Sequence, residues 1–219
     1  MIVRVEACVD SRAAAREAGS AGADRLELCA DLAEEGTTPE RETIAATLAD
    51  SALPLHVMIR VRPGDFHYSG DELEQMRRDI TALRALGIAG VVLGTLDERG
   101  AIDIAALERL VEAARPLAVT FHRAFDQVAD PLAALDVLME LGIERVLTAG
   151  HAGSAEAGIP MLAELVQRSA GRSEILAGGG IRQHNVQRIV RETGVREVHL
   201  RAGPGAVWLR GVRAALAEP

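Results

Sequence analysis

Short apolar stretches alternate with amphipathic stretches along the whole chain, and this alternation predicts a repeated strand–helix unit. Strands are expected at residues 2–9, 24–29, 54–60, 89–93, 117–122, 144–148, 174–178 and 196–201. Helices are expected at residues 11–19, 40–51, 71–86, 103–114, 131–141, 156–169, 184–192 and 205–217. Strand starts recur every 22 to 35 residues, which is the spacing of a β–α unit.

Eight such units predict a (β/α)₈ TIM-type barrel of parallel strands, with residues 1–219 as one domain. A doubly wound open sheet is the structural alternative. That fold does not require eight units, and the first strand here is not followed by a glycine-rich dinucleotide turn. In a barrel of this type the chemistry takes place at the C-terminal ends of the strands, so we expect the function there.

Side chains alternate between the two faces of a strand, and in five strands the polar side chains share one face. These residues are Arg4, Glu6 and Cys8; Arg25, Glu27 and Cys29; His56, Met58 and Arg60; Thr120 and His122; and Glu197, His199 and Arg201. The apolar faces must meet the helices, so the polar faces are expected to point into the barrel. Since an unpaired buried charge is costly, the interior holds either an ionic network or a ligand-binding mouth.

The charge balance excludes some classes of partner. The chain has 24 basic and 32 acidic residues and a formal net charge of −8, which argues against binding to duplex nucleic acid or to an anionic membrane surface. It has neither the pattern of a signal peptide nor an apolar stretch long enough to span a membrane. All 24 basic residues are arginine, so a lysine-imine mechanism is excluded.

The two cysteines are the candidate metal ligands. Cys8 and Cys29 end neighbouring strands on the same face, where two thiolates could hold a soft ion such as copper(I), with the thioether of Met58 as a further ligand. The alternative is that both cysteines are small core residues. Two cysteines form no disulfide framework, and reduced thiols in a cytoplasmic protein are the simplest interpretation.

His122 is the candidate for proton transfer, because it ends the fifth strand and an unperturbed imidazole titrates near neutral pH. Asp126 or Glu27 would orient its ring, and a glutamate beside Arg60 is expected to stay ionised. The alternative is a buried histidine that only ties down the following loop. His199 is expected to lie deeper in the barrel.

The glycine turn after the seventh strand is a candidate anion site. Gly179 and Gly180 precede a helix, and backbone N–H groups at this place in a barrel often hold a phosphate. Arg182 and Arg123 would add positive charge. The alternative is a tight turn that needs glycine for its backbone conformation.

Several segments together resemble one known family. They are Cys8-Val9-Asp10-Ser11, residues 22–29, residues 35–39, residues 57–66, residues 120–126 and Gly178-Gly179-Gly180-Ile181-Arg182. The chain resembles the CutC copper-homeostasis family over nearly its whole length. The resemblance implies a cytoplasmic barrel, often a homo-oligomer, that binds copper(I) through cysteines matching Cys8 and Cys29. It implies no established reaction, so an enzyme acting on a small anionic or phosphorylated metabolite is kept as the alternative function.

Overall fold

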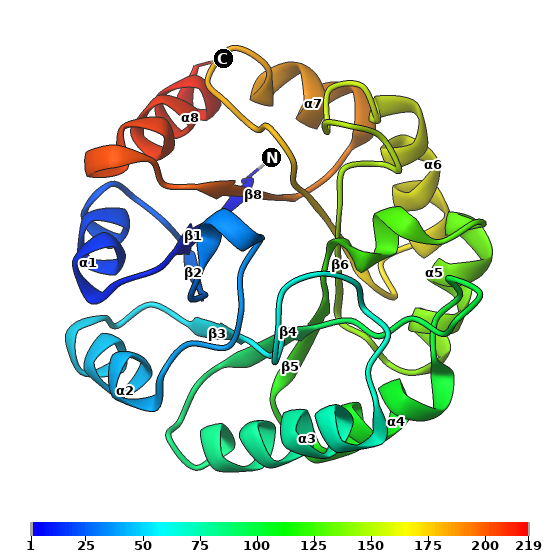
Figure 1. Cartoon of the computed structure of the whole chain (residues 1–219). Helices are drawn as coiled ribbons and strands as arrows, with labels where there is room; N and C mark the ends of the chain where they lie inside the picture. The colour runs from blue at the N-terminus through cyan, green and yellow to red at the C-terminus, as the bar shows by residue number, and fades with distance from the viewer. Residues whose placement is uncertain (1, 219) are drawn as a thin grey trace.

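A computed structural model describes residues 2–218, and it confirms the (β/α)₈ barrel. The strands are β1 (Arg4–Val9), β2 (Arg25–Leu28), β3 (Leu55–Met58), β4 (Gly90–Leu93), β5 (Ala118–Phe121), β6 (Arg145–Thr148), β7 (Glu174–Ala177) and β8 (Glu197–Arg201). Every strand pairs in parallel with its neighbours, and β8 closes the barrel by pairing with β1, so the helices form an outer ring (Figure 1).

The helices alternate with the strands in the order predicted from the sequence. They are α1 (Arg12–Ser20), α2 (Arg41–Asp50), α3 (Gly70–Arg84), α4 (Ile104–Ala114), α5 (Pro131–Glu140), α6 (Ile159–Ser169), α7 (Val186–Thr193) and α8 (Val207–Ala217). Short 3₁₀ helices η1 (Leu32–Glu34), η2 (Arg123–Gln127) and η3 (Pro204–Ala206) follow β2, β5 and β8. These three segments lie at the C-terminal ends of their strands and therefore help to form the mouth of the barrel.

Local side chains fix where several helices begin. Ser69 and Glu72 form a capping box at the start of α3, and Asp103 and Asp130 accept N–H groups from the first turns of α4 and α5. The helix expected from residue 156 begins instead at Ile159. The preceding residues form turns that are held to the mouth, since the N–H of Ala155 donates to the carbonyl of Gly179 at 2.8 Å.

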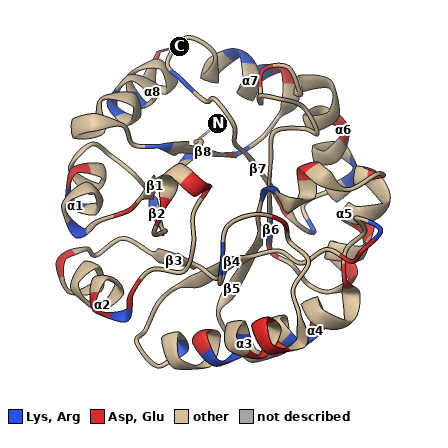
Figure 2. Cartoon of the chain, viewed as in Figure 1, with Lys and Arg blue, Asp and Glu red and all other residues tan. Residues whose placement is uncertain are grey.

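The alternation of side chains within the strands places the apolar core between the barrel and the helices. Val5, Leu26, Val57 and Val198, from four different strands, are completely buried in this layer. Acidic and basic residues are both distributed around the outer ring of helices (Figure 2). Within residues 2–218, no helix combines the length and the apolar character that crossing a bilayer requires.

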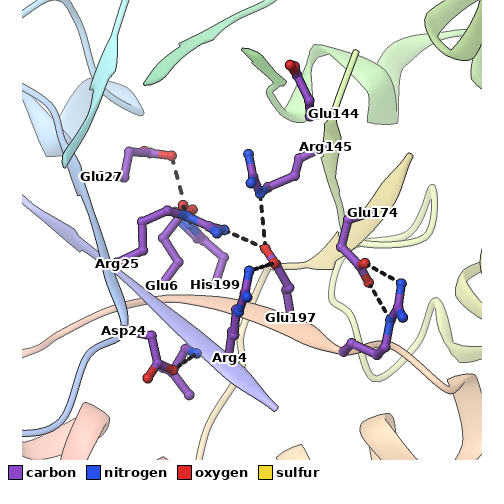
Figure 3. Close-up of polar contacts among 12 residues, drawn as sticks. Arg4, Glu6, Asp24, Arg25, Glu27, Glu144, Arg145, Glu174, Glu197 and His199 are labelled. Carbon is purple, nitrogen blue, oxygen red and sulfur yellow. Dashed lines mark hydrogen bonds and ion pairs between the residues drawn. The ribbon is translucent and has the colours of Figure 1, made fainter. Parts of the chain in front are cut away.

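Buried ion pairs fill the part of the barrel interior nearest the N-terminal ends of the strands, which we call the lower interior (Figure 3). The guanidinium of Arg25 lies 2.5 Å from a carboxylate oxygen of Glu6 and 2.6 Å from one of Glu197. Arg145 approaches Glu197 at 3.2 Å, and Nδ1 of His199 lies 2.7 Å from the other oxygen of Glu6. Charges of opposite sign therefore alternate along the interior, and we call this set of five residues the ion-pair network.

Inward-facing arginines near the strand starts could belong either to an ionic network or to a ligand-binding mouth, and the structure distinguishes the two for Arg25. Arg25 is 5% exposed and belongs to the network. Arg4 was expected to point inward, but its side chain is 65% exposed and only its tip approaches Glu197, at 3.5 Å. The difference arises because Arg4 is the first residue of β1, where the end of the barrel is open to solvent and a long side chain can reach out.

Replacing Arg25 by methionine tests how strongly the fold depends on this network. The substitution keeps the apolar stem but leaves Glu6 and Glu197 without their main cation, so we expect the free energy of unfolding to fall by about 3–5 kcal/mol. Urea unfolding followed by circular dichroism measures the change. Arg168→Met is the matched control, because Arg168 pairs with Asp136 on the exposed surface and should cost far less. Equal losses in the two variants would contradict the central role of the network.

Candidate functional site

A cavity of about 360 Å³ opens at the C-terminal ends of the strands. This volume lies in the range of about 300–1,000 Å³ that is typical of small-molecule sites. Its inner part is lined by Cys8, Glu27, Met58 and His199, one wall by Arg60, Phe66 and His122, and its rim by Arg123, Gly179, Gly180, Arg182, Arg201 and Trp208. The structure thus brings most of the candidate residues from six strands or their following loops into one cavity.

Two thiols lie side by side at the inner end of this cavity: Cys8 lines it, whereas Cys29 is 1% exposed and does not contribute to its lining. Parallel pairing of β1 with β2 sets Cys8 opposite Glu27, and Cys29 follows two residues later. The sulfur atoms of Cys8 and Cys29 are 3.8 Å apart, and Oε1 of Glu27 lies 3.0 Å from Cys29 Sγ and 3.6 Å from Cys8 Sγ. Met58 belongs to the same buried cluster, so a third sulfur-bearing side chain packs against the pair.

Glycine is required beside the cysteine pair. Gly36 has a φ of 94°, and a Cβ atom there would lie 3.2 Å from Cys29 Sγ and 3.5 Å from Cε of Met58. A larger residue at this position would crowd Cys29 and would also have to adopt a strained left-handed backbone conformation. The loop after β2 therefore packs closely against Cys29.

The surroundings set the protonation of this inner end. The hydrogen bond with Cys29 lowers the pKa of the Cys8 thiol, and the same contact raises the pKa of Cys29. Burial raises the pKa of Glu27. Burial also works to lower the pKa of His199, but the neighbouring charge of Glu27 and the contacts with Cys8 and Glu6 outweigh it and raise that pKa. His199, which the sequence analysis placed deeper and outside the main candidates, is therefore a cation that faces Cys8 and Glu27.

Arg60 ties two loops of the mouth together. Its guanidinium donates to the carbonyl oxygens of Glu34, Gly36 and Gly64 at 2.7–3.0 Å, and it lies over the ring of Phe66. Arg60 was expected beside an ionised glutamate, but Glu27 contacts the two cysteines and His199 instead. The carbonyl groups draw Arg60 toward the loops, so it does not lower the pKa of Glu27, and burial outweighs the opposing effect of His199.

His122 is buried and neutral. The N–H of Ala124 donates to its Nδ1 at 3.2 Å, so Nε2 carries the proton. This Nε2 is buried and meets no partner in the described part of the chain. Burial, reinforced by the charge of Arg60, lowers the pKa of His122 to about 3. The near-neutral value expected from the sequence therefore does not hold, because the imidazolium form would be desolvated next to a guanidinium.

The position of the His122 ring depends on a glycine in the neighbouring strand connection. A Cβ atom at Gly94 would lie 2.5 Å from both Cε1 and Nδ1 of the ring. On another side the ring of Phe66 approaches with a centroid distance of 4.7 Å. The imidazole thus occupies a space that only glycine at position 94 leaves open.

Asp126 has a different role from the one expected. It does not line the cavity or orient His122; it accepts hydrogen bonds from Thr148 Oγ1 at 2.5 Å and from the N–H of Ala149 at 3.1 Å, and it pairs with Nε of Arg123 at 2.8 Å. The 3₁₀ helix η2 turns the chain after His122 so that Asp126 faces the end of β6. Asp126 consequently anchors the loop after β6 and holds Arg123 at the rim.

The three histidines outside the strands lie away from these contacts. His184 and His151 are exposed, His67 is partly exposed, and none of the three lines the cavity. The residue that sequence reasoning underrated is His199. The sequence does place His199 on the same inward face of its strand as Glu197. Its position next to Cys8, however, depends on the register between β8 and β1.

Comparisons with known proteins show the family and agree with the fold. A family model described as the CutC family matches residues 3–204. A human protein named copper homeostasis protein cutC homolog is 46% identical over 90% of this chain and 72% of its own length, and a Parabacteroides distasonis protein named family protein CutC is 45% identical over 90% and 82%. A crystal structure of a CutC protein from Streptococcus agalactiae has a TM-score of 0.86 at 34% identity, covering 90% of this chain and 98% of that one.

The neutral state of His122 can be tested directly. Because its pKa is depressed to about 3, the ring should keep one proton, on Nε2, from about pH 8 down to about pH 5. Long-range ¹H–¹⁵N spectra of histidine-labelled protein should show an unchanging neutral imidazole for this residue, assigned by its loss in His122→Asn. A midpoint near the ordinary histidine value for His122 would contradict the buried, neutral assignment.

Proposed function

The chain belongs to the CutC family, and from this premise we propose that it binds copper(I) through Cys8, which lines the inner end of the cavity, and Cys29, which is buried beside it. The relatives that carry a functional name are named for copper homeostasis. The observation that carries the proposal is the pair of buried, free cysteines whose sulfur atoms lie 3.8 Å apart. Two thiolates around one ion at metal–sulfur distances of about 2.3 Å lie at a comparable separation.

The chemistry of the donors fits a soft monovalent ion. Copper(I) prefers thiolate and thioether ligands, and Met58 packs beside the two cysteines as the nearest thioether. Ligating thiols must lose their protons. Oε1 of Glu27 lies within hydrogen-bonding distance of both sulfur atoms, so the carboxylate form of this residue can take up a proton that a binding ion displaces.

A second donor set shares Cys8 and must be distinguished from the first. Cys8, Glu27 and His199 each contribute one potential ligand atom, and the three atoms lie within 4.8 Å of one another. A mixed set of sulfur, oxygen and nitrogen ligands of this kind suits zinc. This set offers one sulfur atom, whereas copper(I) favours a site with two thiolates. The sulfur pair therefore carries the proposal, and preference for copper(I) over zinc(II) follows from it.

The proposal has consequences for location and assembly. Reduced cysteines at this separation suit the cytoplasm, where thiols are kept from forming disulfides. We therefore place the protein there as part of the proposal. Assembly into a homo-oligomer stays a prediction from the family resemblance.

Anaerobic titration against a chromophoric copper(I) chelator tests the sulfur site. We expect about one equivalent of copper(I) per chain and a loss of competitive binding in Cys8→Ser and in Cys29→Ser, because one remaining thiolate is a much weaker site. Met58→Leu should weaken binding less than either cysteine variant. Zinc(II) at the same concentration should not displace the bound copper(I).

Met139→Leu is the matched control for Met58, since Met139 is a buried methionine in α5 and lies outside the cavity. It should bind copper(I) as the parent protein does. Circular dichroism of each variant establishes that the barrel is folded. A double cysteine variant that competes for copper(I) as well as the parent would refute the proposed site, and the two cysteines would then be core residues.

A further inference from the structure

The turn after β7 presents backbone donors that nothing in the described structure satisfies. Gly179 and Gly180 have φ values of 94° and 79°, so two successive residues adopt the left-handed conformation. Their carbonyl groups are bonded, to the N–H of Ala155 and to the side chain of Asn185, but within residues 2–218 their own N–H groups meet no acceptor. Successive N–H groups in such turns form concave sites for anions.

Arginines gather around this turn without enough carboxylates to balance them. The cavity is lined by four arginines and two glutamates, although the whole chain carries a net charge of −8. Arg182 and Arg201 donate only to backbone carbonyls, and neither makes an ion pair in the part of the chain that the structure describes. Burial and the nearby charge of Arg201 lower the pKa of Arg182, so the two cations are close enough to repel each other. An anion between them would relieve that repulsion.

The arginines are held in place by contacts that leave their donors free. Arg182 lies over the ring of Trp208, with its Cζ atom 3.9 Å from the ring centroid. Arg123 is held by Asp126 through Nε alone, and a Cβ atom at Gly179 would lie 3.7 Å from its Cζ. The guanidinium groups are thus fixed beside the glycine turn, which lowers the entropic cost of binding a ligand there.

Two buried donors on the adjoining wall of the cavity also have no partner. Nε of Arg60 and Nε2 of His122 are buried without an acceptor, and their residues are 2% and 4% exposed. An unsatisfied buried donor is costly, so its presence in a cavity wall points to a ligand that supplies the acceptor. These donors are independent of the glycine turn and belong to different strand ends.

We propose that the cavity binds a small phosphate monoester, with its phosphate group held by the N–H groups of Gly179 and Gly180 and by Arg123, Arg182 and Arg201. The body of the ligand extends into the cavity, where a carbonyl or hydroxyl oxygen accepts from His122 Nε2. A cavity of about 360 Å³ has room for more than a phosphate ion, and the uncharged imidazole suits a neutral oxygen better than a second anion. The proposal is independent of copper binding, which uses the inner sulfur atoms.

The chain carries its own reporter for this site. Trp208 is the only tryptophan, and it lines the cavity under Arg182. Titration of the parent protein with inorganic phosphate and with glycerol 3-phosphate, at constant ionic strength, should give saturable changes in its fluorescence. The monoester should bind more tightly, because it also reaches the wall with His122. Calorimetry gives the affinities of variants in which the surroundings of the tryptophan are altered.

Arg182→Gln and Arg201→Gln should each weaken the binding of both probes by about tenfold or more, since each removes a charge-assisted hydrogen bond. Arg172→Gln is the matched control, because this exposed arginine precedes β7 at the opposite end of the barrel and should bind as the parent does. His122→Asn should reduce the advantage of the monoester and leave the affinity for inorganic phosphate unchanged.

The outcomes separate this proposal from the copper proposal. The Cys8→Ser, Cys29→Ser double variant should keep its affinity for phosphate. Absence of saturable binding of either probe would overturn the proposal, as would equal affinities for the parent, Arg182→Gln and Arg201→Gln. Binding of inorganic phosphate with no gain for glycerol 3-phosphate would overturn the assignment of an organic monoester.

Discussion

The interior of this barrel depends on the contact of Arg25 with two buried carboxylates, Glu6 and Glu197. Most barrels of this type fill the same space with layers of branched apolar side chains. Here each charge is held by one of opposite sign, so the desolvation of any one residue is offset only while its neighbours are in place. The network continues through Glu6 to His199, and in this way it contributes to the charge of a residue that faces the cavity.

The inner end and the rim of the cavity differ in their charges. His199 is a cation chiefly because of the charge of Glu27, to which Cys8 and the network residue Glu6 add, and it favours the thiolate form of Cys8 next to it. At the rim, by contrast, arginines outnumber carboxylates and bind backbone carbonyls. A soft cation and a hard anion thus suit opposite ends of one cavity. Fold alone would not reveal this division, since the same barrel supports many unrelated sites.

Much of this could be predicted from the sequence because it depends on regular geometry. The spacing of apolar stretches was sufficient for eight strand–helix units, and the alternation along β1, β2 and β8 identified the polar interior. The alternation of side chains between the two faces of a strand does not predict which partner each polar residue contacts. Arg60 turned toward loop carbonyls rather than toward Glu27, and Asp126 anchored a loop rather than His122. Such contacts depend on loop conformation, and the low pKa of His122 depends on burial, neither of which a local pattern records.

The missing side chain at Gly94 has a consequence for how the His122 ring can move. The ring is confined by the Gly94 backbone on one side and by Phe66 on another, and its Nδ1 is held by the N–H of Ala124. Rotation of the ring by half a turn would break that hydrogen bond and drive ring carbon atoms toward a backbone N–H. The direction of the Nε2–H bond is therefore set before any ligand arrives, and a ligand that accepts from it meets a donor that needs no reorientation. The ring at this strand end is therefore held in one orientation, because glycine at position 94 lets the backbone pack directly against it.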